Sequence, residues 1–438
     1  MHTVIKKVPE AISRGASPRQ LKLLVLAFDC HPTLPSLPVI AFKMCRELGE
    51  LAEVTVVSRK QDDHFEIRGT ETEFINIEAI KKPLDAVADV LRGGRSVGWT
   101  TKTAFTYPSY LAFERAVWKR YKTALRAGEY DAVLRISPMS PILVSPMAKW
   151  CPVPFIVGPV NGGLPFPKEV MYAQKKEREW LNPLRKFHRH LPYAQSSYNS
   201  SDAILAGFQH TIDGLPESSL HKVINFPEIG YDPSLFHPAA TMPPTGRLRF
   251  VFVGRLVPGK AADSLIEAFA HSEALRQHQL TIVGEGPDRK LMEGLIREHS
   301  LEGCVELVGA KSQAEVGEIL RNSHVFAFPS IRELGAGVVI EAMGSGLPCI
   351  AFDSGAQACL VGSDRGVPVE LVPRDKMPPL LAAAMLRYIE EPGLLEQHRR
   401  RALAYASGYT WRHKAENILE TIRWTIGETT EKPEFYPL

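Results

Sequence analysis

The sequence has no long apolar run and no apolar segment at its start. None of its 438 residues falls in a stretch that approaches the roughly 20 apolar residues of a membrane-spanning helix. Residues 1–20 are polar and basic, so we expect a flexible N-terminal segment there and no secretory signal. These absences predict a cytoplasmic protein.

Cysteine and excess charge are also scarce. The six cysteines show neither C-x-x-C pairs nor zinc-ligand spacing, and most of them stand beside apolar runs. We therefore expect buried, reduced thiols, no bound metal and no cofactor. The formal net charge is only +3, which gives no reason to expect a nucleic-acid partner.

The chain instead alternates short apolar runs with helical patterns. This alternation is typical of doubly wound parallel sheets, and the length suits two α/β domains better than one. The predicted strands cover 21–28, 53–57, 132–136, 155–157, 203–206, 223–226, 248–253, 280–283, 305–308 and 325–328. Pro238, Pro243 and Pro244 mark a linker because proline breaks both helix and strand ladder. We predict an N-terminal Rossmann-like domain at 21–240 and a C-terminal one at 241–408.

Two glutamates, Glu333 and Glu341, frame a strand–loop–helix segment in the second domain. Glu333 follows the strand at 325–328, and Glu341 lies where a helical pattern begins. Between them, Gly335, Ala336, Gly337 and Val338 would bring backbone N–H groups and a helix N-terminus to an anion. Carboxylates on both sides of a diphosphate site could bind two sets of hydroxyls, which is the shape of a nucleotide-sugar.

Two cations support this interpretation. Arg255 follows the strand at 248–253 after Gly254, and Lys260 stands five residues later. Arginine grips phosphate oxygens with its planar fork, and lysine adds a point charge. Together they would stabilise a departing diphosphate. Each of these residues also has an ordinary interpretation: basic residues are common on surfaces, and acids are favoured near helix N-termini.

The combination resembles family 4 glycosyltransferases (glycosyl transferases group 1). Gly254-Arg255-Leu256 with Lys260, the run from Val283 to Pro287, Phe328-Pro329-Ser330 and the run from Glu333 to Met343 carry it over roughly 248–365. The resemblance implies the GT-B fold, in which two Rossmann-like domains face a cleft and a C-terminal helix, here within 409–438, crosses back to the N-terminal domain. It also implies transfer of a sugar, with retention, from a nucleoside-diphosphate sugar to a hydroxyl acceptor.

The resemblance assigns roles to single residues. Glu341 would accept hydrogen bonds from ribose hydroxyls, and Glu333 would position the transferred sugar. It places Gly284 near the nucleotide, and Gly309 and Lys311 near the base. The sequence contains no Asp-x-Asp motif for a divalent ion, which agrees with Arg255 and Lys260 balancing the diphosphate charge without metal.

The N-terminal half departs from the family pattern. Prolines stiffen the loop at 31–38 that is often glycine-rich in relatives, and no histidine stands beside Arg135 and Ser137, which are candidates for its place. Asn161 and Gly162 are expected to line the cleft. His31 is a further candidate, although a single loop histidine is more often structural.

Two basic and aromatic stretches, 92–126 and 168–190, suit either an anionic membrane interface or an ordinary helix face over a buried aromatic stripe. The acceptor could therefore be lipid-linked, with peripheral contact at the inner face of the membrane, or a glycan or metabolite. Two rival functions stay open: a nucleotide-sugar epimerase on the same scaffold, and a non-catalytic partner subunit of a glycosyltransferase.

Overall fold

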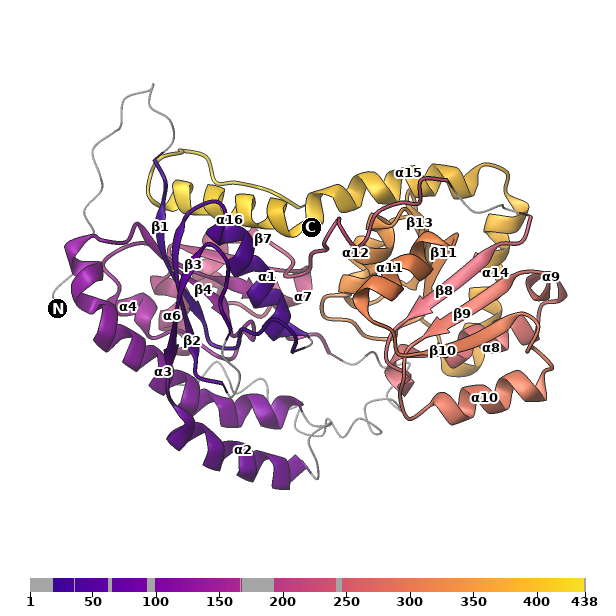
Figure 1. The fold of residues 1–438 in the computed structure, drawn as a ribbon, viewed down its shortest axis with the longest axis horizontal. Helices are drawn as coiled ribbons and strands as arrows, with labels where there is room; N and C mark the ends of the chain where they lie inside the picture. The colour runs from indigo at the N-terminus through magenta and orange to yellow at the C-terminus, as the bar shows by residue number, and fades with distance from the viewer. Residues whose placement is uncertain are drawn as a thin grey trace. The chain divides into compact units, whose positions relative to one another are not determined.

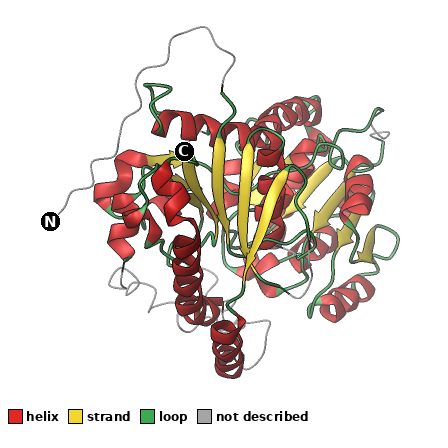
Figure 2. Ribbon diagram, turned by 60° about the vertical axis from the view of Figure 1, so that its left-hand side comes forward, coloured by secondary structure: helices red, strands yellow, loops and turns green. Residues whose placement is uncertain are grey.

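The computed structural model describes residues 19–34, 36–61, 65–92, 99–165, 167, 193–241 and 246–436. These residues fall into two compact units. The first unit corresponds to the ranges 1–163, 177–228 and 411–438, and the second unit corresponds to 164–176 and 229–410. Each unit has a parallel β-sheet of its own, and its strands are yellow in Figure 2. The domain limits that the sequence predicts, at 240/241 and 408/409, are not the limits of these two units, and they remain predictions.

The first unit contains a seven-stranded sheet in the order β3-β2-β1-β4-β5-β6-β7, with parallel pairs throughout. Its strands are β1 (Lys22–Ala27), β2 (Glu53–Arg59), β3 (Thr70–Ile75), β4 (Ala132–Ser137), β5 (Phe155–Val160), β6 (Ala203–Ala206) and β7 (Val223–Asn225). Because β1 pairs with both β2 and β4, the strand order reverses beside β1. Ligands of doubly wound proteins bind at the carboxyl ends of strands at such a point.

Helices cover this sheet (Figure 1). They are α1 (Leu37–Gly49), α2 (Glu78–Arg92), α3 (Trp99–Ala127), α4 (Met147–Trp150), α6 (Ala194–Ser200), α7 (Gln209–Ile212) and α16 (Trp411–Thr425), with a 3₁₀ turn at Glu217–Lys222. The last helix, α16, packs against α1. The Lys43 ammonium lies 5.6 Å from the ring centroid of Trp411 in that contact. The C-terminal residues of the chain thus complete the first unit.

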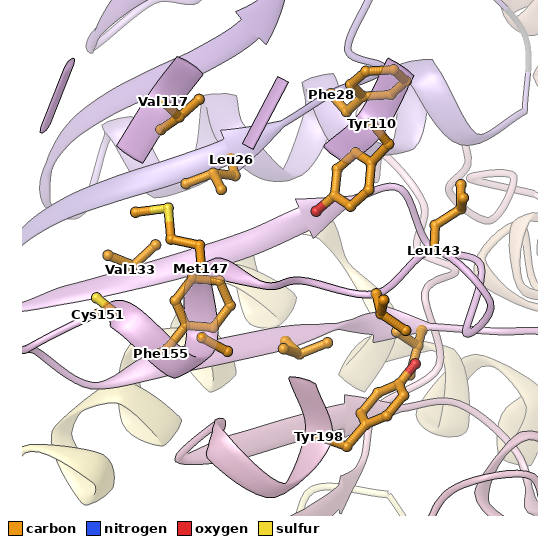
Figure 3. Packing of buried hydrophobic residues seen from close by; sticks show 14 of the residues in the cluster. Leu26, Phe28, Tyr110, Val117, Val133, Leu143, Met147, Cys151, Phe155 and Tyr198 are labelled. Atoms are coloured by element: carbon orange, nitrogen blue, oxygen red, sulfur yellow. The ribbon is translucent and has the colours of Figure 1, made fainter. Parts of the chain in front are cut away.

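The aromatic stripe of α3 belongs to the core of the first unit. Tyr110, Phe113, Val117 and Tyr121 recur every three or four residues and are buried. Figure 3 shows Tyr110 beside Phe28, and their ring centroids are 5.3 Å apart. The interleaved bases Arg115, Lys119 and Lys122 are exposed.

This arrangement shows the buried aromatic stripe in the described part of the stretch at 92–126, and contact of its exposed basic residues with a membrane stays a prediction. Its aromatic side chains pack inward, as the helix-face alternative predicted, because burying a Tyr or Phe ring stabilises the fold by more than a scattered surface contact does. The other stretch, 168–190, lies outside the described residues. Across the described ranges, we find no helix with both the length and the apolar character needed to cross a bilayer.

The second unit contains a six-stranded parallel sheet in the order β10-β9-β8-β11-β12-β13. Its strands are β8 (Arg249–Val253), β9 (Gln279–Val283), β10 (Val305–Gly309), β11 (Val325–Phe328), β12 (Cys349–Phe352) and β13 (Gly366–Val369). The helices are α8 (Asp263–Ala270), α9 (Glu273–Arg276), α10 (Arg289–Glu298), α11 (Gln313–Arg321), α12 (Gly337–Gly344), α13 (Gly355–Leu360), α14 (Met377–Glu390) and α15 (Leu394–Ala406), with 3₁₀ turns at Pro258–Lys260, Arg374–Lys376 and Ser407–Tyr409. Here β8 pairs with both β9 and β11, so the strand order reverses beside β8.

The predicted fold class, two Rossmann-like parallel-sheet domains, is confirmed. All ten predicted strands are present within a few residues of their predicted limits, whereas β3, β12 and β13 were not predicted. All six cysteines are free thiols, five of them buried, while Cys359 is exposed.

Candidate functional site

Two glycine turns at the carboxyl ends of β8 and β9 fit against each other. Gly254 donates its N–H to the carbonyl of Val283 at 3.0 Å, and Leu256 donates to Glu285 at 2.9 Å. Gly284 adopts a φ of 143°, and a Cβ there would collide with the carbonyl oxygen of Gly254. The predicted importance of Gly284 therefore has a conformational cause, because a side chain would separate the two turns. The first turn leads into Arg255 and Lys260.

The loop from β11 to α12 lies against the same turn. Ile331 donates its N–H to the carbonyl of Gly259 at 2.9 Å, which joins the Glu333 loop to the Lys260 loop. Ala336 has a left-handed φ of 56° and precedes α12, whose first residues are Gly337 and Val338. The N-terminus of α12 thus begins directly after the loop that carries Glu333.

Both segments line one cavity of about 390 Å³. It collects nine of the predicted site residues: Gly254, Arg255, Lys260, Lys311, Glu333, Ala336, Gly337, Val338 and Glu341. They come from segments up to 87 positions apart in the sequence, and the carboxyl ends of β8, β10 and β11 bring them together. Gly335, Gly284 and Gly309 do not line the cavity; the last two shape the turns behind it.

The charges in the cavity are partly paired. Lys260 forms an ion pair with Glu333, and their side chains are only 19% and 13% exposed. The ammonium of Lys260 also lies 5.1 Å from the ring centroid of Phe328. Lys311 is 3.6 Å from Glu315 one turn further along the chain, in α11, whereas Arg255 is exposed. Cationic groups therefore line one part of a cavity whose other part is lined by the N-terminus of α12.

Five lining residues were not predicted as site residues: Phe236, Val253, Gln313, Val316 and Phe328. Four of them are apolar, and an apolar residue in a strand or helix pattern indicates core. Phe236 precedes the proline-rich linker, where nothing in the local sequence indicates a ligand. Gln313 begins α11 and resembles an ordinary first-turn residue.

The acceptor-side candidates lie in the first unit. Asn161 is buried and donates from Nδ2 to Glu228 Oε1 at 2.6 Å, while its Oδ1 accepts from Thr211 at 3.2 Å. Gly162 donates its N–H to Thr211 Oγ1 at 3.1 Å. His31 is 5% exposed, and its Nδ1 accepts from the N–H groups of Thr33 and Leu34, both at 3.2 Å. His31 therefore orders the proline-rich loop, and a contact with substrate stays a prediction.

The two candidates at the end of β4, Arg135 and Ser137, also make hydrogen bonds within the first unit. Arg135 is fully buried and donates to the carbonyl of Leu143. Ser137 Oγ donates to the carbonyl of Asp29 and accepts from its N–H, both at 3.0 Å. Arg135 is thus enclosed in the core of the first unit, and Ser137 ties the loop after β1 to the end of β4.

A buried ionisable pair stands behind Asn161. Burial raises the pKa of Glu228 from an ordinary 4.5 to about 7. Lys414 of α16 is also fully buried; it donates to the carbonyl of Pro227 at 2.5 Å and lies about 4 Å from the rings of Phe226 and Tyr436. Burial lowers the pKa of Lys414 well below its ordinary value, because a charged amine loses its hydration in the core. Nothing in the local sequence indicated this pair.

The described residues contain no group of three or more His, Cys, Asp or Glu side chains placed to hold a metal ion. Metal independence stays a prediction.

Comparison with known protein families identifies the family of a domain in the second unit. Residues 236–406 match the family model described as Glycosyl transferases group 1, so the chain carries a domain of this family. The matched residues contain the whole cavity described above. Of the sequence-based resemblance, the group 1 assignment of this domain is confirmed, and the assignment to family 4 remains a prediction.

Three curated relatives are similar to part of the chain. One subunit of the phosphatidylinositol N-acetylglucosaminyltransferase of Arabidopsis thaliana is 30% identical over 155 residues, covering 35% of this chain and 34% of the relative. The D-inositol 3-phosphate glycosyltransferase of Kineococcus radiotolerans is 30% identical over 193 residues, covering 40% and 44%. The GDP-mannose-dependent alpha-mannosyltransferase of Mycobacterium tuberculosis is 32% identical over 172 residues, covering 38% and 43%. The chain thus matches less than half of the length of these relatives.

Solved structures are similar to nearly the whole chain, and this similarity concerns the fold alone. Sucrose-phosphate synthase from Thermosynechococcus elongatus has a TM-score of 0.60 at 17% identity, covering 94% of this chain and all of that one. HepE of Anabaena, in complex with UDP and glucose, has a TM-score of 0.56 at 16% identity, covering 92% and 99%. The fold of these proteins is therefore that of the present chain.

Proposed function

We propose that the protein is a retaining, metal-independent glycosyltransferase that moves a hexose from a nucleoside-diphosphate sugar to a hydroxyl acceptor. The observation that carries this proposal is the cavity of the second unit, where Arg255, Lys260, Glu333 and Glu341 meet the N-terminus of α12. The named activities of the curated relatives support the reaction class, and two of those names include an inositol compound, which carries hydroxyl groups.

The diphosphate would bind between the cations and α12. Breaking the bond to the anomeric carbon leaves negative charge on the departing diphosphate, and preorganised cations and N–H groups stabilise that charge. Lys260 and Arg255 would supply the cations, and the first turn of α12 would add its N–H groups and dipole.

The two glutamates would bind hydroxyls on opposite sides of that diphosphate. Glu341 would accept hydrogen bonds from the ribose, and Glu333 would position the transferred sugar. A carboxylate beside the anomeric carbon also favours the positive charge that develops there. Retention without a covalent intermediate requires attack on the face that the diphosphate leaves, so the leaving phosphate itself could take the proton of the acceptor hydroxyl. Glu333 then acts by positioning rather than as a base.

The acceptor would bind mainly on the first unit, with Asn161 and Gly162 among its contacts. A lipid-linked acceptor is one candidate, since a relative is named for phosphatidylinositol, and glycans and small metabolites are others. A cytoplasmic location and peripheral membrane contact remain part of the proposal.

A screen of the purified protein against UDP-, GDP-, ADP- and dTDP-sugars tests the function. We expect micromolar binding and slow hydrolysis of one nucleotide-sugar, with hydrolysis much reduced in Lys260→Ala and binding weakened in Glu341→Ala. Conversion of the sugar without an acceptor would favour the epimerase alternative. Binding of none of the four would favour the non-catalytic subunit.

A further inference from the structure

The side chain of Glu333 is held by two residues that the sequence analysis did not predict as site residues, although Ser330 belongs to the Phe328-Pro329-Ser330 motif. We propose that Ser330 and Gln357 are positioning residues that fix Glu333, so that its carboxylate keeps its orientation when Lys260 turns toward the donor diphosphate. This inference rests on the proposed function for its catalytic consequence. The contacts themselves do not depend on it.

Ser330 is the first of these residues. It is fully buried, and its hydroxyl lies 2.5 Å from Glu333 Oε1 and 3.3 Å from the carbonyl of Gly259. A hydroxyl has one proton, and the ionised carboxylate is both the nearer and the stronger acceptor. Ser330 therefore donates to Glu333.

Lys260 donates to the same carboxylate oxygen, Oε1. Both described donors thus converge on one oxygen, which leaves Oε2 on the other side of the carboxylate as the acceptor for sugar hydroxyls. The ammonium of Lys260 can pair with Glu333 or with a phosphate, and a doubly charged diphosphate is the stronger competitor. When Lys260 turns to phosphate, Ser330 keeps Oε1 hydrogen-bonded and the carboxylate in place.

The start of α13 holds the backbone on both sides of Ser330 and Glu333. Gln357, which is fully buried, donates from Nε2 to the carbonyl of Ser330 at 2.7 Å. Ala356 donates its N–H to the carbonyl of Glu333 at 2.9 Å. Gly355 has a φ of 65°, and a Cβ there would stand 2.6 Å from the Glu333 carbonyl oxygen. The close approach of α13 therefore requires glycine at that position, and it fixes both residues of the hydrogen-bonded pair.

Kinetics of Ser330→Ala and Gln357→Met test the catalytic consequence, with Ser323→Ala as the matched control. Ser323 is also a buried serine of the second unit, but its hydroxyl donates to Ile319 on α11 and not to the cavity. On the best nucleotide-sugar of the panel, we expect kcat to fall about tenfold or more in Ser330→Ala, since a hydrogen bond to a charged group is lost. The Kd of the sugar-free nucleoside diphosphate should stay within about twofold of wild type.

The values of kcat and of the nucleoside-diphosphate Kd together distinguish a loss of positioning from a general distortion of the cavity. A kcat of Ser330→Ala equal to that of Ser323→Ala would overturn the proposal. So would a nucleoside-diphosphate Kd that rises in step with the loss of kcat, because a distorted cavity would weaken both. Gln357→Met, which keeps the length of the side chain and removes the donor, should show the same separation with a smaller loss of kcat.

A second measurement does not require the protein to be catalytically active. Urea unfolding, followed by circular dichroism, compares Ser330→Ala, Glu333→Ala and the double variant. We expect the effects on the unfolding equilibrium constant to depart from additivity by about tenfold, because the two changes remove the same hydrogen bond. Ser323→Ala combined with Glu333→Ala should be additive. Additivity of the Ser330 pair overturns the proposal. Coupling in a protein that turns over no nucleotide-sugar rejects the proposed function and retains the positioning of Glu333.

Discussion

Lys260 is the residue whose substitution should affect turnover most directly. Its ammonium is held within the cavity by Glu333 and by the ring of Phe328, so it is already placed beside the expected position of the diphosphate. We expect Lys260→Ala to lower kcat about 10²- to 10³-fold, the range found when one group that stabilises developing charge is removed. Lys290→Ala, an exposed lysine of α10 outside the cavity, should leave kcat unchanged. A near wild-type rate for Lys260→Ala would contradict the role.

Glu341 should act on binding instead. Replacing it by Ala removes the acceptor proposed for the ribose hydroxyls, and we expect the Kd of the free nucleoside diphosphate to rise about tenfold. Isothermal titration calorimetry measures this directly. Glu333→Gln is the matched comparison, because Glu333 is proposed to bind only the sugar and its substitution should leave nucleoside-diphosphate affinity nearly unchanged. Equal affinity of wild type and Glu341→Ala would remove the ribose assignment.

Glu228 predicts a pH dependence of stability. With its pKa raised from 4.5 to about 7 by burial, the native state holds a proton that the unfolded state has lost across this interval. Stability therefore falls as the pH rises from about 5 to 8, by up to about 3 kcal/mol from this group. The lowered pKa of Lys414 acts in the opposite direction. We expect Glu228→Gln to be less stable than wild type, or equal to it, at pH 5 and more stable at pH 8 in urea unfolding. A difference between the two proteins that does not change with pH would contradict the buried protonated carboxyl.

Residue by residue, the sequence predicted every charged residue that lines the cavity and missed four of its apolar residues. Arg255, Lys260, Glu333 and Glu341 stand at strand ends and helix starts, where charged side chains indicate a ligand. Phe236 and Val316 line the same cavity, but only the folded chain distinguishes an apolar residue of a site from one of the core.

At the scale of elements, the turns after β8 and β9 are the most constrained part of the site. Gly284→Ala forces a Cβ into the carbonyl of Gly254 and imposes a φ that L-residues rarely adopt. Gly393→Ala is the matched control, because Gly393 also has a positive φ, 82°, but a Cβ there meets nothing within 4 Å. We expect Gly284→Ala to lose at least about 2 kcal/mol more stability than Gly393→Ala, together with nucleotide binding. Equal losses in thermal unfolding would show that the turns can separate.

Some of the strands that the sequence revealed are buried on both faces, such as β11, whose run is continuously apolar, and β1, which is apolar after Lys22. β3 was missed because it is an edge strand with the polar sequence Thr-Glu-Thr-Glu-Phe-Ile and no fully buried position. In α3 the sequence allowed two interpretations of the same aromatic residues. The rings of Tyr110 and Phe113 pack against Phe28, just after β1, and packing partners distant in sequence are not visible in a local pattern.

At the scale of the whole molecule, the sequence predicted two parallel sheets because strand and helix patterns alternate in each half of the chain. The assignment of segments to units depends instead on contacts between residues far apart in the sequence. The residues from 411 onward are an example: their helical spacing is visible locally, but their place beside α1 in the first unit depends on contacts such as that of Lys43 with Trp411.

The division into two units predicts how the protein should respond to its donor. The five tryptophans among the described residues, at 99, 118, 150, 411 and 424, fall within the first unit, whereas the candidate donor cavity is lined entirely by the second. Fluorescence of these five tryptophans therefore reports unfolding of the first unit, and circular dichroism reports both. A ligand stabilises the state that binds it, by about 2.7 kcal/mol at a hundredfold excess over its Kd.

Because each unit has its own sheet and core, we expect a bound nucleoside diphosphate to raise the midpoint of a thermal transition seen by circular dichroism while the fluorescence transition stays in place. At the same ligand concentration, Glu341→Ala should reduce that shift to about half, because the ligand is then only about tenfold above its Kd. Equal shifts in both signals would mean that the two units unfold together, or that the nucleotide also contacts the first unit, and the donor site would then extend beyond residues 229–410.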